Sequence, residues 1–432
     1  MNIIFNDSNN SIGGIEVMFI EMAKYLSTKS NNVYFIVDNS SVYEDELNHL
    51  NNIYFIKKKY VGNIELMSKR KINREREYVL SQLDLDQDYF VISPYFQKLQ
   101  YAMAIFKPMK NFKLIHLWAH PQQWAKQIKL IPTNSFSNKI KRTKKYKYQK
   151  RLLMLLEEKR AHYYSARAIT VFNNWYYNIS LNPTTIETLP IQSTSESPKV
   201  YSKHEFNNKK TIRILWCGRL TYFKNEAIIE IANVLNKLAE LYPKYNIEYG
   251  IIGFGSEQDE KYIKENINSD KIKIDFLGKV RPNNLLNIFK EYDIGVAMGL
   301  TVKKMGQVGL PAIVIDSFEK ERKHNKNSNW LFETAEGDAG DGYYYEVANK
   351  VIENRKELFD LLNEVFETPS LLNKYSIKCI NYVAKHYSFE KQIQAVIDTC
   401  KNSTFYADDY PVYRRNFALR ILYSFYKNIK SR

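Results

Sequence analysis

The sequence predicts an α/β protein built from two doubly wound domains in series. Short, nearly continuous apolar runs alternate with longer amphipathic segments along the chain, which is the pattern of βαβ units whose parallel sheet is covered on both faces. The alternation stops in a polar stretch near residue 200 and then restarts. The chain has 432 residues, and chains longer than about 300 residues usually divide into separate domains.

The first half of the chain alternates strand patterns with helical ones. A helix is expected from Gly14, because GIEVMFIEMAKYLS repeats apolar residues at helical spacing. Runs rich in β-branched and aromatic residues predict six strands: NIIFN (2–6), NVYFIVD (32–38), IYFIKK (53–58), YFVIS (89–93), KLIHLWA (113–119) and AITVFN (168–173).

The second half repeats this organisation after a polar linker. Strands are predicted at TIRILWCG (211–218), NIEYGIIGFG (246–255), KIDFLGKV (273–280), DIGVAM (293–298) and PAIVID (311–316), with helical patterns between them. We therefore expect an N-terminal domain over 1–195, a linker over 196–210, a C-terminal domain over 211–385 and C-terminal helices over 386–432. Ligands of such sheets bind beyond the carboxyl ends of the strands.

Composition and charge limit the classes of function. The chain is 44% hydrophobic and 25% charged, which is typical of a globular protein and not of a disordered one. Its three cysteines, Cys217, Cys379 and Cys400, are too few and too widely spaced for a disulfide framework or a metal knuckle, so we expect a reducing, cytoplasmic compartment. No stretch approaches the roughly 20 apolar residues of a membrane-spanning helix. The formal charge of +16 predicts an anionic partner.

Two segments outside the alternation concentrate positive charge beside apolar residues. The segment NKIKRTKKYKYQKR (138–151) holds eight Lys or Arg and no acid, and the apolar LLMLL follows it. The stretch 411–432 reads as a helix with one apolar face and a mostly basic opposite face. We expect 138–156 and 411–432 to contact an anionic membrane surface, on the inner face of the cell membrane. For 411–432, packing against the N-terminal domain is an equal alternative.

No helix-turn-helix, zinc-finger or RNA-recognition signature accompanies these basic residues. Nucleic acid is therefore not an expected partner, even though Lys and Tyr are interleaved in 138–151.

The motif ILWCGRLTYFKNEAIIEIANVL has the features of a pyrophosphate site. A buried strand ends at Gly218, Arg219 follows directly, and Lys224 precedes the next helical pattern. An arginine fork, a lysine charge and the free amides of a helix start all favour a diphosphate. The alternative interpretation is a solvated basic turn.

The order of several motifs resembles the retaining glycosyltransferases of the GT-B fold, family 4 type. These motifs are GGIEVMFIEMAKYL, GRLTYFKN, YGIIGFGSE, IDFLGKV and YDIGVAMG with GLPAIVID, and together they cover most of the chain. The resemblance implies two Rossmann-like domains that face each other across a cleft. It also implies a nucleotide-sugar donor held mainly by the C-terminal domain and a glycan or lipid-linked acceptor bound mainly by the N-terminal domain.

By this resemblance, Arg219 and Lys224 match the pair that neutralises the departing diphosphate. Fixed cations stabilise that charge without a metal, so no obligatory divalent ion and no cofactor are expected.

Two further parts of the C-terminal domain complete the expected donor site: a pair of glycines after its second predicted strand, and the end of its third predicted strand. Gly253 and Gly255 follow a strand, where the backbone passes close to a ligand or turns tightly. The resemblance places the nucleotide base near Gly278, Lys279 and Val280.

In the N-terminal half the candidate catalytic residue is His120, in KLIHLWAHPQQW. His116 lies inside the strand pattern and is interpreted as a structural residue, whereas His120 lies just past the strand end. Relatives carry a His there that contacts the donor sugar, so His120 is expected to orient the sugar or to stabilise charge through a hydrogen bond.

The sequence departs from the family at VAMGLTVKKMGQVGLPAIVID. Lys304 stands where the second of two family glutamates is expected, and the loop is too short to supply the first. A lysine cannot accept hydrogen bonds from the ribose hydroxyls that this Glu commonly holds. Either donor binding is rearranged, with Thr301 or a backbone group as the substitute, or the domain has lost activity.

The doubled glycine of SIGGIEVMF is expected to form the opposite wall of the donor site. Gly13 and Gly14 open the first helix, where amides accept an anionic group that a Cβ would obstruct. Glu16 is either a favourable acid of the first helical turn or a contact to the acceptor or sugar.

The sequence thus predicts a metal-independent, retaining glycosyltransferase of surface-polysaccharide synthesis, in a lipopolysaccharide or capsule pathway. A non-catalytic GT-B subunit that acts as a scaffold at the membrane is the alternative from another class. Another GT-B activity, such as nucleotide-sugar epimerisation, is a further alternative.

Overall fold

The computed structural model of the chain separates into two compact units. It describes residues 1–8, 13–38, 41–60, 62–118, 124, 143–164, 167–180, 210–267, 270–317, 325–338, 340, 342–348, 350, 352 and 354–414. Unit 1 contains the described residues within Met1–Ser165, Asn173–Glu187 and Gln392–Arg432, and unit 2 contains those within Ala166–Phe172 and Thr188–Lys391. The boundary between the units therefore runs through two helices, α7 and α16, whose bounds are given below.

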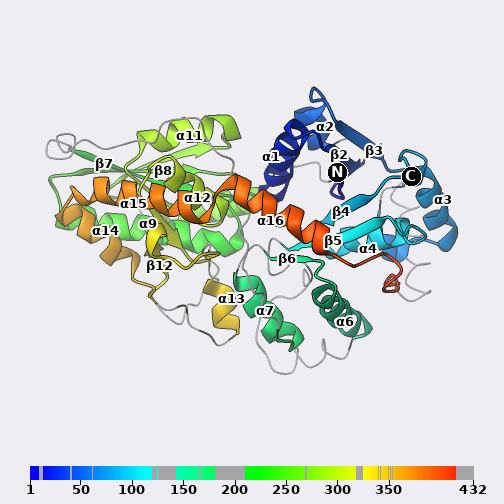
Figure 1. Ribbon diagram of the computed structural model, residues 1–432. Helices are drawn as coiled ribbons and strands as arrows, with labels where there is room; N and C mark the ends of the chain where they lie inside the picture. The colour runs from blue at the N-terminus through cyan, green and yellow to red at the C-terminus, as the bar shows by residue number, and fades with distance from the viewer. Residues whose placement is uncertain are drawn as a thin grey trace. The chain divides into compact units, whose positions relative to one another are not determined.

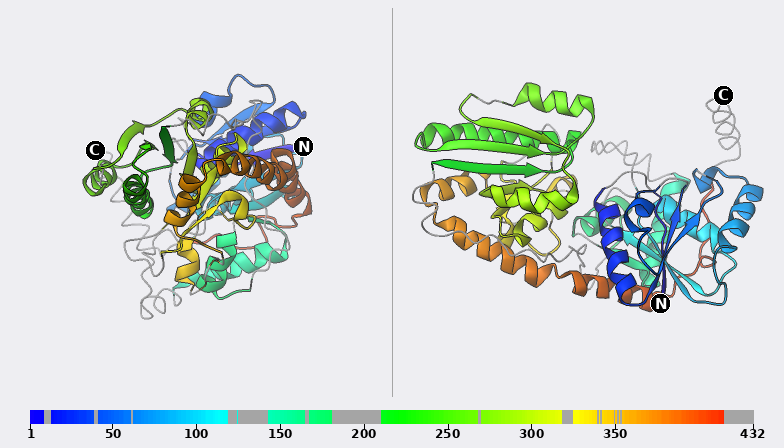
Figure 2. Two further views of the ribbon diagram at one scale, coloured as in Figure 1. Left: turned by 90° about the vertical axis from the view of Figure 1, so that its left-hand side faces the viewer. Right: turned by 90° about the horizontal axis from the view of Figure 1, so that it is seen from above.

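Unit 1 is a parallel sheet with helices on both sides (Figures 1 and 2). Its strands have the order β3-β2-β1-β4-β5-β6 and all their pairings are parallel. The strands are β1 (Asn2–Phe5), β2 (Asn32–Val37), β3 (Ile53–Lys57), β4 (Tyr89–Ser93), β5 (Phe112–Trp118) and β6 (His162–Tyr164). The helices are α1 (Gly14–Thr28), α2 (Val42–Leu47), η1 (Ile64–Leu66), α3 (Lys69–Leu80), α4 (Phe96–Ile105), α6 (Lys144–Glu158) and α7 (Arg167–Tyr177).

The sixth predicted strand is wrong, because AITVFN lies in helix α7. The buried residues of this helix are 168, 169, 172, 173, 176 and 177. Burial therefore repeats every four residues and continues past the six residues of AITVFN. The sixth strand is instead β6, only three residues long, which pairs with β5 through His116 and His162.

Unit 2 is a second doubly wound sheet, with strand order β12-β11-β10-β7-β8-β9. Its strands are β7 (Thr211–Cys217), β8 (Asn246–Ile252), β9 (Lys273–Gly278), β10 (Ile294–Ala297), β11 (Ala312–Ile315) and β12 (Ser328–Trp330). Its helices are α9 (Tyr222–Leu241), α10 (Glu257–Asn266), α11 (Pro282–Glu291), α12 (Leu300–Gln307), η3 (Leu331–Glu333), α13 (Gly342–Val347), α14 (Leu358–Glu367), α15 (Leu371–His386) and α16 (Phe389–Asn402), the last of which continues into unit 1. All strands predicted for this half are present, and the short edge strand β12, which the sequence pattern did not reveal, is antiparallel to β11.

The two faces of the unit 2 sheet have separate apolar cores. Trp216 of β7 packs on one face with residues of α9 and α14. Leu215 and Cys217 point to the other face, where they join residues of α11, α12 and α15. This alternation follows from the two-residue period of a strand, and it brings Cys217 into the same core as α12.

Helix α6 explains why the basic segment 138–151 leads into an apolar run. Thr143 caps the helix, since its hydroxyl accepts the Tyr146 amide N–H. Leu152, Leu153 and Leu156 are buried in unit 1, so these leucines pack within the protein. The basic face of α6, which we define as Lys144, Lys147 and Arg151, is exposed. Residues 138–142 and 415–432 lie outside the described residues.

The segment after α16 packs against β5 within unit 1. The Leu114 amide donates to the Phe405 carbonyl (2.9 Å), and the Ser403 hydroxyl donates to the Leu114 carbonyl (3.3 Å). Residues near 405 therefore contribute to the same unit as the first strands of the chain.

None of the helices in the described ranges is long and apolar enough to cross a membrane.

Candidate functional site

The connection between β7 and α9 carries the two cations predicted to bind a diphosphate. Arg219 is exposed directly after Gly218, and Lys224 is half-buried in the first turn of α9. The Lys224 Nζ lies 3.7 Å from the position that a Cβ on Gly218 would take. Thr221 precedes α9, but its hydroxyl does not cap the helix. The cations therefore lie beside a helix start without a side-chain cap, which favours a negative charge there.

Lys304 approaches the same strand end from α12. Burial raises the pKa of the Cys217 thiol to about 12, while the charges of Lys224 and Lys304 act in the opposite direction. Both ammonium groups are thus close enough to act electrostatically on the last residue of β7. The lysine found in place of the expected glutamate adds positive charge to the region of Lys224.

Gly253 and Gly255 are required by the neighbouring backbone. A Cβ on Gly253 would lie 2.1 Å from the Gly218 carbonyl oxygen, and one on Gly255 would lie 2.2 Å from the Leu220 carbonyl oxygen. The Gly218 and Leu220 amides donate to the Ile252 and Phe254 carbonyls, both at 3.0 Å. Close packing of two strand ends therefore requires glycine at both positions.

The end of β9 is open to solvent. Gly278 has a φ of +65°, in the left-handed region that favours glycine, and no atom lies within 4 Å of its ideal Cβ position. Lys279 is exposed, with its Nζ 4.9 Å from the centre of the exposed Phe254 ring. Val280 packs in part against the core shared with α12.

The connection from β10 to α12 contains only Met298 and Gly299. Gly299 has a φ of +68° and precedes α12 without a side-chain cap. Thr301 lies in the first turn of this helix, half-buried. The structure therefore agrees with the short loop noted in the sequence, which leaves no position for the first family glutamate.

Lys303 is a buried charge in α12 that sequence reasoning missed. Its side chain is buried, and its Nζ lies 4.2 Å from the centre of the ring of Tyr387, which directly follows α15. Two consecutive residues of a helix point to different sides of it. In the sequence, only the position of each lysine relative to the apolar face of α12 could have distinguished buried Lys303 from half-buried Lys304.

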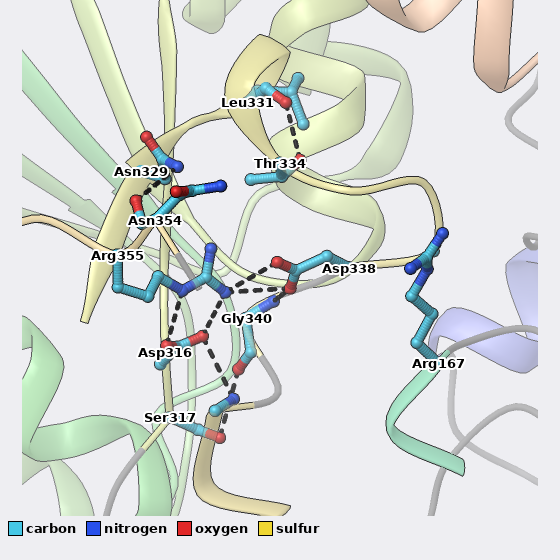
Figure 3. Close-up of polar contacts among 12 residues, drawn as sticks. Arg167, Asp316, Ser317, Asn329, Leu331, Thr334, Asp338, Gly340, Asn354 and Arg355 are labelled. Atoms are coloured by element: carbon cyan, nitrogen blue, oxygen red, sulfur yellow. Dashed lines mark hydrogen bonds and ion pairs between the residues drawn. The ribbon is translucent and has the colours of Figure 1, made fainter. Parts of the chain in front are cut away.

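A buried ionic cluster lies beyond the end of β11 (Figure 3). Arg355 binds Asp316 through two hydrogen bonds, from Nε at 2.9 Å and Nη2 at 2.7 Å. The same Nη2 lies 2.9 Å from Asp338. The amides of Gly340 and Gly342 donate to Asp338 and Asp316, each at 3.2 Å. The cluster therefore joins three loop segments after β11.

Burial raises the pKa of Asp316 to about 6, against the opposing effect of Arg355. Burial alone would lower the pKa of Arg355, but Asp316 and Asp338 together raise it. At neutral pH the cluster therefore holds one cation and at least one ionised carboxylate. In the sequence, the feature that could have indicated this cluster is Asp316, a charged residue directly after a buried strand.

In unit 1, Gly13 and Gly14 begin α1 as predicted. Glu16 is buried in the first turn, and its Oε2 lies 2.7 Å from the ideal Cβ position of Gly13. The glutamate carboxylate is thus folded back over the helix start, where the helix dipole favours an acid.

His116 and Trp124 belong to a buried aromatic group at the end of β5. The Trp124 Nε1 donates to the His116 Nε2 at 2.8 Å. Burial, with a contribution from His162, lowers the pKa of His116 well below its usual value, so His116 is neutral. This environment agrees with the structural interpretation of His116. The predicted catalytic residue His120 lies outside the described residues.

Among the described residues, no group of three or more His, Cys, Asp or Glu side chains is placed to hold a metal ion.

Comparison with known proteins gives matches among solved structures. No protein-family model matches the sequence, and no curated protein matches it. A glycosyltransferase from Rickettsia africae is 15% identical, with a TM-score of 0.57 over 93% of this chain and 97% of that chain. Anabaena Alr3699/HepE, solved with UDP-glucose, is 14% identical, with a TM-score of 0.55 over 93% of this chain and 99% of that chain.

WaaG, described as a glycosyltransferase involved in lipopolysaccharide biosynthesis, is 11% identical, with a TM-score of 0.53 over 92% of this chain and 99% of that chain. At such low sequence identity, these similarities show a shared fold and nothing further. The whole described chain, with its two doubly wound sheets, has the GT-B fold.

Proposed function

We propose that the protein is a glycosyltransferase that uses a nucleotide-sugar donor bound by unit 2. The observation that carries the proposal is the presence of Arg219 and Lys224 at the end of β7, with Lys304 close enough to act on the same strand end. Positive charge concentrated beside an uncapped helix start suits a diphosphate.

The reaction explains why these cations are useful. When the bond between the sugar and the diphosphate breaks, negative charge grows on the leaving group. Arg219 and Lys224 supply positively charged hydrogen-bond donors that stabilise this charge. No metal is required for this role, so transfer is expected to be metal-independent, and the family resemblance supports retention of the anomeric configuration.

Donor recognition differs from the family pattern because Lys304 cannot accept hydrogen bonds from a ribose. We assign the ribose contact to the Thr301 hydroxyl or to a backbone group at the start of α12, which is near Gly299 and has no side-chain cap. Gly278, Lys279 and Val280 are proposed to border the nucleotide base, with the exposed Phe254 ring beside Lys279 as a stacking surface.

The remaining roles rest on the family resemblance. His120 is proposed to contact the donor sugar, and the helix start at Gly13 and Gly14 to contribute to the donor site. Because Glu16 is buried against Gly13, we assign it to the helix start in preference to an acceptor contact.

The acceptor is proposed to be a surface glycan or its lipid-linked precursor, at the inner face of the cell membrane. WaaG, whose fold is similar, is described as acting in lipopolysaccharide biosynthesis. The exposed basic face of α6 supports contact with an anionic leaflet through charge, since the leucines of that helix are buried.

A nucleotide-binding screen tests the donor site. UDP and GDP, with and without EDTA, are titrated against the wild-type protein, Arg219→Ala and Lys224→Ala by calorimetry. Each variant is expected to bind the nucleoside diphosphate at least about tenfold more weakly, because it loses a charge-assisted hydrogen bond. Lys261→Ala, which removes an exposed cation of α10, is the matched control. Unchanged affinity in both site variants contradicts this assignment.

A catalytically inactive GT-B subunit remains the second candidate, favoured by the two-residue connection before α12 and by Lys304. Hydrolysis of UDP- and GDP-sugars separates the candidates, because an inactive subunit shows no turnover above a Lys224→Ala control. Product analysis without acceptor identifies an epimerase, which would return an isomerised nucleotide sugar. NMR of the anomeric configuration of a transfer product tests retention.

A further inference from the structure

Two lysines of unit 1 converge on one serine hydroxyl at the carboxyl edge of the sheet. Ser8 follows β1, Lys58 follows β3, and Lys98 lies in the first turn of α4, after β4. The Lys58 Nζ donates to the Ser8 Oγ at 2.7 Å, and the Lys98 Nζ donates to the same oxygen at 2.6 Å. The two ammonium groups are thus no more than about 5 Å apart and repel each other.

Carboxylates balance these charges from a greater distance. Lys58 lies 3.5 Å from Asp38, and Lys98 lies 3.5 Å from Asp7. Asp7 is itself fully buried and accepts the Tyr43 hydroxyl at 2.6 Å. Among the described residues, the Ser8 hydroxyl therefore lies closer to each ammonium group than these carboxylates do.

The other groups that face the pair are engaged elsewhere. The Tyr101 ring lies 4.9 Å from the Lys58 Nζ, and its hydroxyl donates to Glu75 at 2.7 Å. Glu75 also accepts the amides of Lys59 and Tyr60. Glu16 acts electrostatically on Tyr43 from its position in α1.

We propose that Lys58, Lys98 and Ser8 form a binding site for a phosphate group carried by the acceptor. A phosphate oxygen is a stronger acceptor than a hydroxyl for two ammonium groups, and the Ser8 hydroxyl is able to donate to a second phosphate oxygen. Lys98 is partly exposed, with 18% of its side chain accessible to solvent. The inference deepens the proposed function, on which it rests for the role of the acceptor.

The test is a phosphate titration in a background that lacks Arg219 and Lys224, the two cations proposed to bind the donor diphosphate. Inorganic phosphate is titrated by calorimetry at pH 8 into the Arg219→Ala, Lys224→Ala protein, alone and with Lys58→Met or Lys98→Met added. Each added substitution is expected to weaken phosphate binding at least about tenfold. Lys57→Met removes the neighbouring lysine, which pairs with Glu44, and is expected to bind as the background protein does.

Equal affinity in all these proteins, or no phosphate binding in any of them, overturns the proposal. Circular dichroism verifies that each variant is folded. If Lys58→Met does not fold, the partly exposed Lys98→Met decides the question.

Proton uptake gives a second readout that a purely structural lysine pair would not produce. Burial and the charge of Lys98 lower the pKa of Lys58 to about 8, so part of the Lys58 population is neutral at pH 8. The negative charge of a bound phosphate dianion favours protonation of the neutral Lys58 amine. Calorimetry in buffers of different ionisation enthalpy detects the proton that is taken up. Phosphate binding without proton uptake, or uptake that persists in Lys58→Met, contradicts the site.

The source of the phosphate is identified by parallel titrations. Glucose 6-phosphate represents a soluble sugar phosphate, and vesicles of phosphatidylglycerol represent a phosphate in a lipid. Whichever ligand binds is expected to lose affinity in Lys98→Met, and failure of that loss for both ligands counts against the proposal. The UDP affinity of the single variant Lys98→Met is expected to equal that of wild type. UDP affinity therefore reports on the donor site, and phosphate affinity reports separately on the site at Ser8.

Discussion

Gly253 illustrates a residue whose importance lies in backbone packing. Its ideal Cβ position is 2.1 Å from the Gly218 carbonyl oxygen, whereas that of Gly278 meets no atom within 4 Å. Gly253→Ala therefore forces the β7–α9 connection away from β8.

Urea unfolding measures the cost of this displacement. We expect Gly253→Ala to lower the free energy of unfolding by about 1–3 kcal/mol, as overpacking does. For Gly278→Ala, where only the left-handed backbone conformation disfavours a side chain, we expect the free energy of unfolding to fall by about 1 kcal/mol. A larger effect at Gly278 than at Gly253 contradicts this account.

Lys58 gives unit 1 a specific dependence on pH. Its pKa is about 8 in the folded protein and 10.5 in its reference state. Below pH 8 both the folded and the unfolded chain are protonated, so the cost of burying the charge is fully present. Between these values the unfolded chain binds more protons, and the free energy of unfolding contributed by Lys58 rises with pH.

Denaturant unfolding from pH 7 to 10.5 checks this sign. The difference in unfolding free energy between wild type and Lys58→Met is expected to shift in favour of wild type above pH 8. Comparing the two proteins at each pH removes the contribution of the tyrosines, which are common to both. A difference independent of pH argues against a lowered pKa.

At the scale of elements, the Asp316–Asp338–Arg355 cluster anchors the loops that follow β11. Among the residues that the structure describes, Arg355 is the cation in contact with these two buried carboxylates. Arg355→Met leaves the two carboxylates without this guanidinium. Breaking a buried ion pair typically lowers the free energy of unfolding by about 3–5 kcal/mol. The neighbouring Lys356 pairs with Glu333 in an exposed position, so Lys356→Met is expected to cost less than about 1 kcal/mol. Thermal or urea unfolding of the two variants makes the comparison.

Most elements could be predicted from sequence because their apolar patterns are long and unambiguous. The exceptions are instructive. AITVFN has strand-like composition, and only the longer repeat through Tyr177 identifies helix α7. Strands β6 and β12 have three residues each, too few for a two-residue alternation to be recognised, and their pairing depends on tertiary contacts.

The candidate site was predictable only in part. Arg219 and Lys224 were found because both belong to one short motif at a strand end. Ser8 and the two lysines that contact it come from three separate segments, and Arg355 is distant in sequence from Asp316. Their proximity in space therefore cannot be recognised from a local sequence pattern. The glycines Gly253 and Gly255 were recognised as constrained, but the neighbouring backbone that constrains them was visible only in the structure.

At the scale of the whole molecule, positive charge provides a test of membrane contact. Reversal of the basic face of α6, Lys144→Glu, Lys147→Glu and Arg151→Glu, removes six charge units from the formal +16 and leaves +10. Each basic residue near an anionic leaflet contributes about 1 kcal/mol, so binding to phosphatidylglycerol vesicles is expected to fall at least about a hundredfold.

A control with the same change in net charge separates position from total charge. Lys237→Glu, Lys244→Glu and Lys261→Glu reverse three exposed lysines of unit 2. Vesicle co-sedimentation of this control is expected to resemble wild type at about 0.1 M salt, because the proposed contact depends on the basic face of α6 and not on the total charge. Equal losses in the two triple variants contradict a role for α6.

The contact of Ser403 with Leu114 has a consequence for synthesis of the chain on the ribosome. The two residues are 289 positions apart, and translation proceeds at about 5–20 residues per second. Strand β5 therefore waits about 15–60 s for its C-terminal neighbours. During that interval unit 2 emerges and is able to complete its own sheet. The unit that begins first is thus the one that finishes last, because the part of β5 at Leu114 gains its C-terminal neighbours only near the end of synthesis.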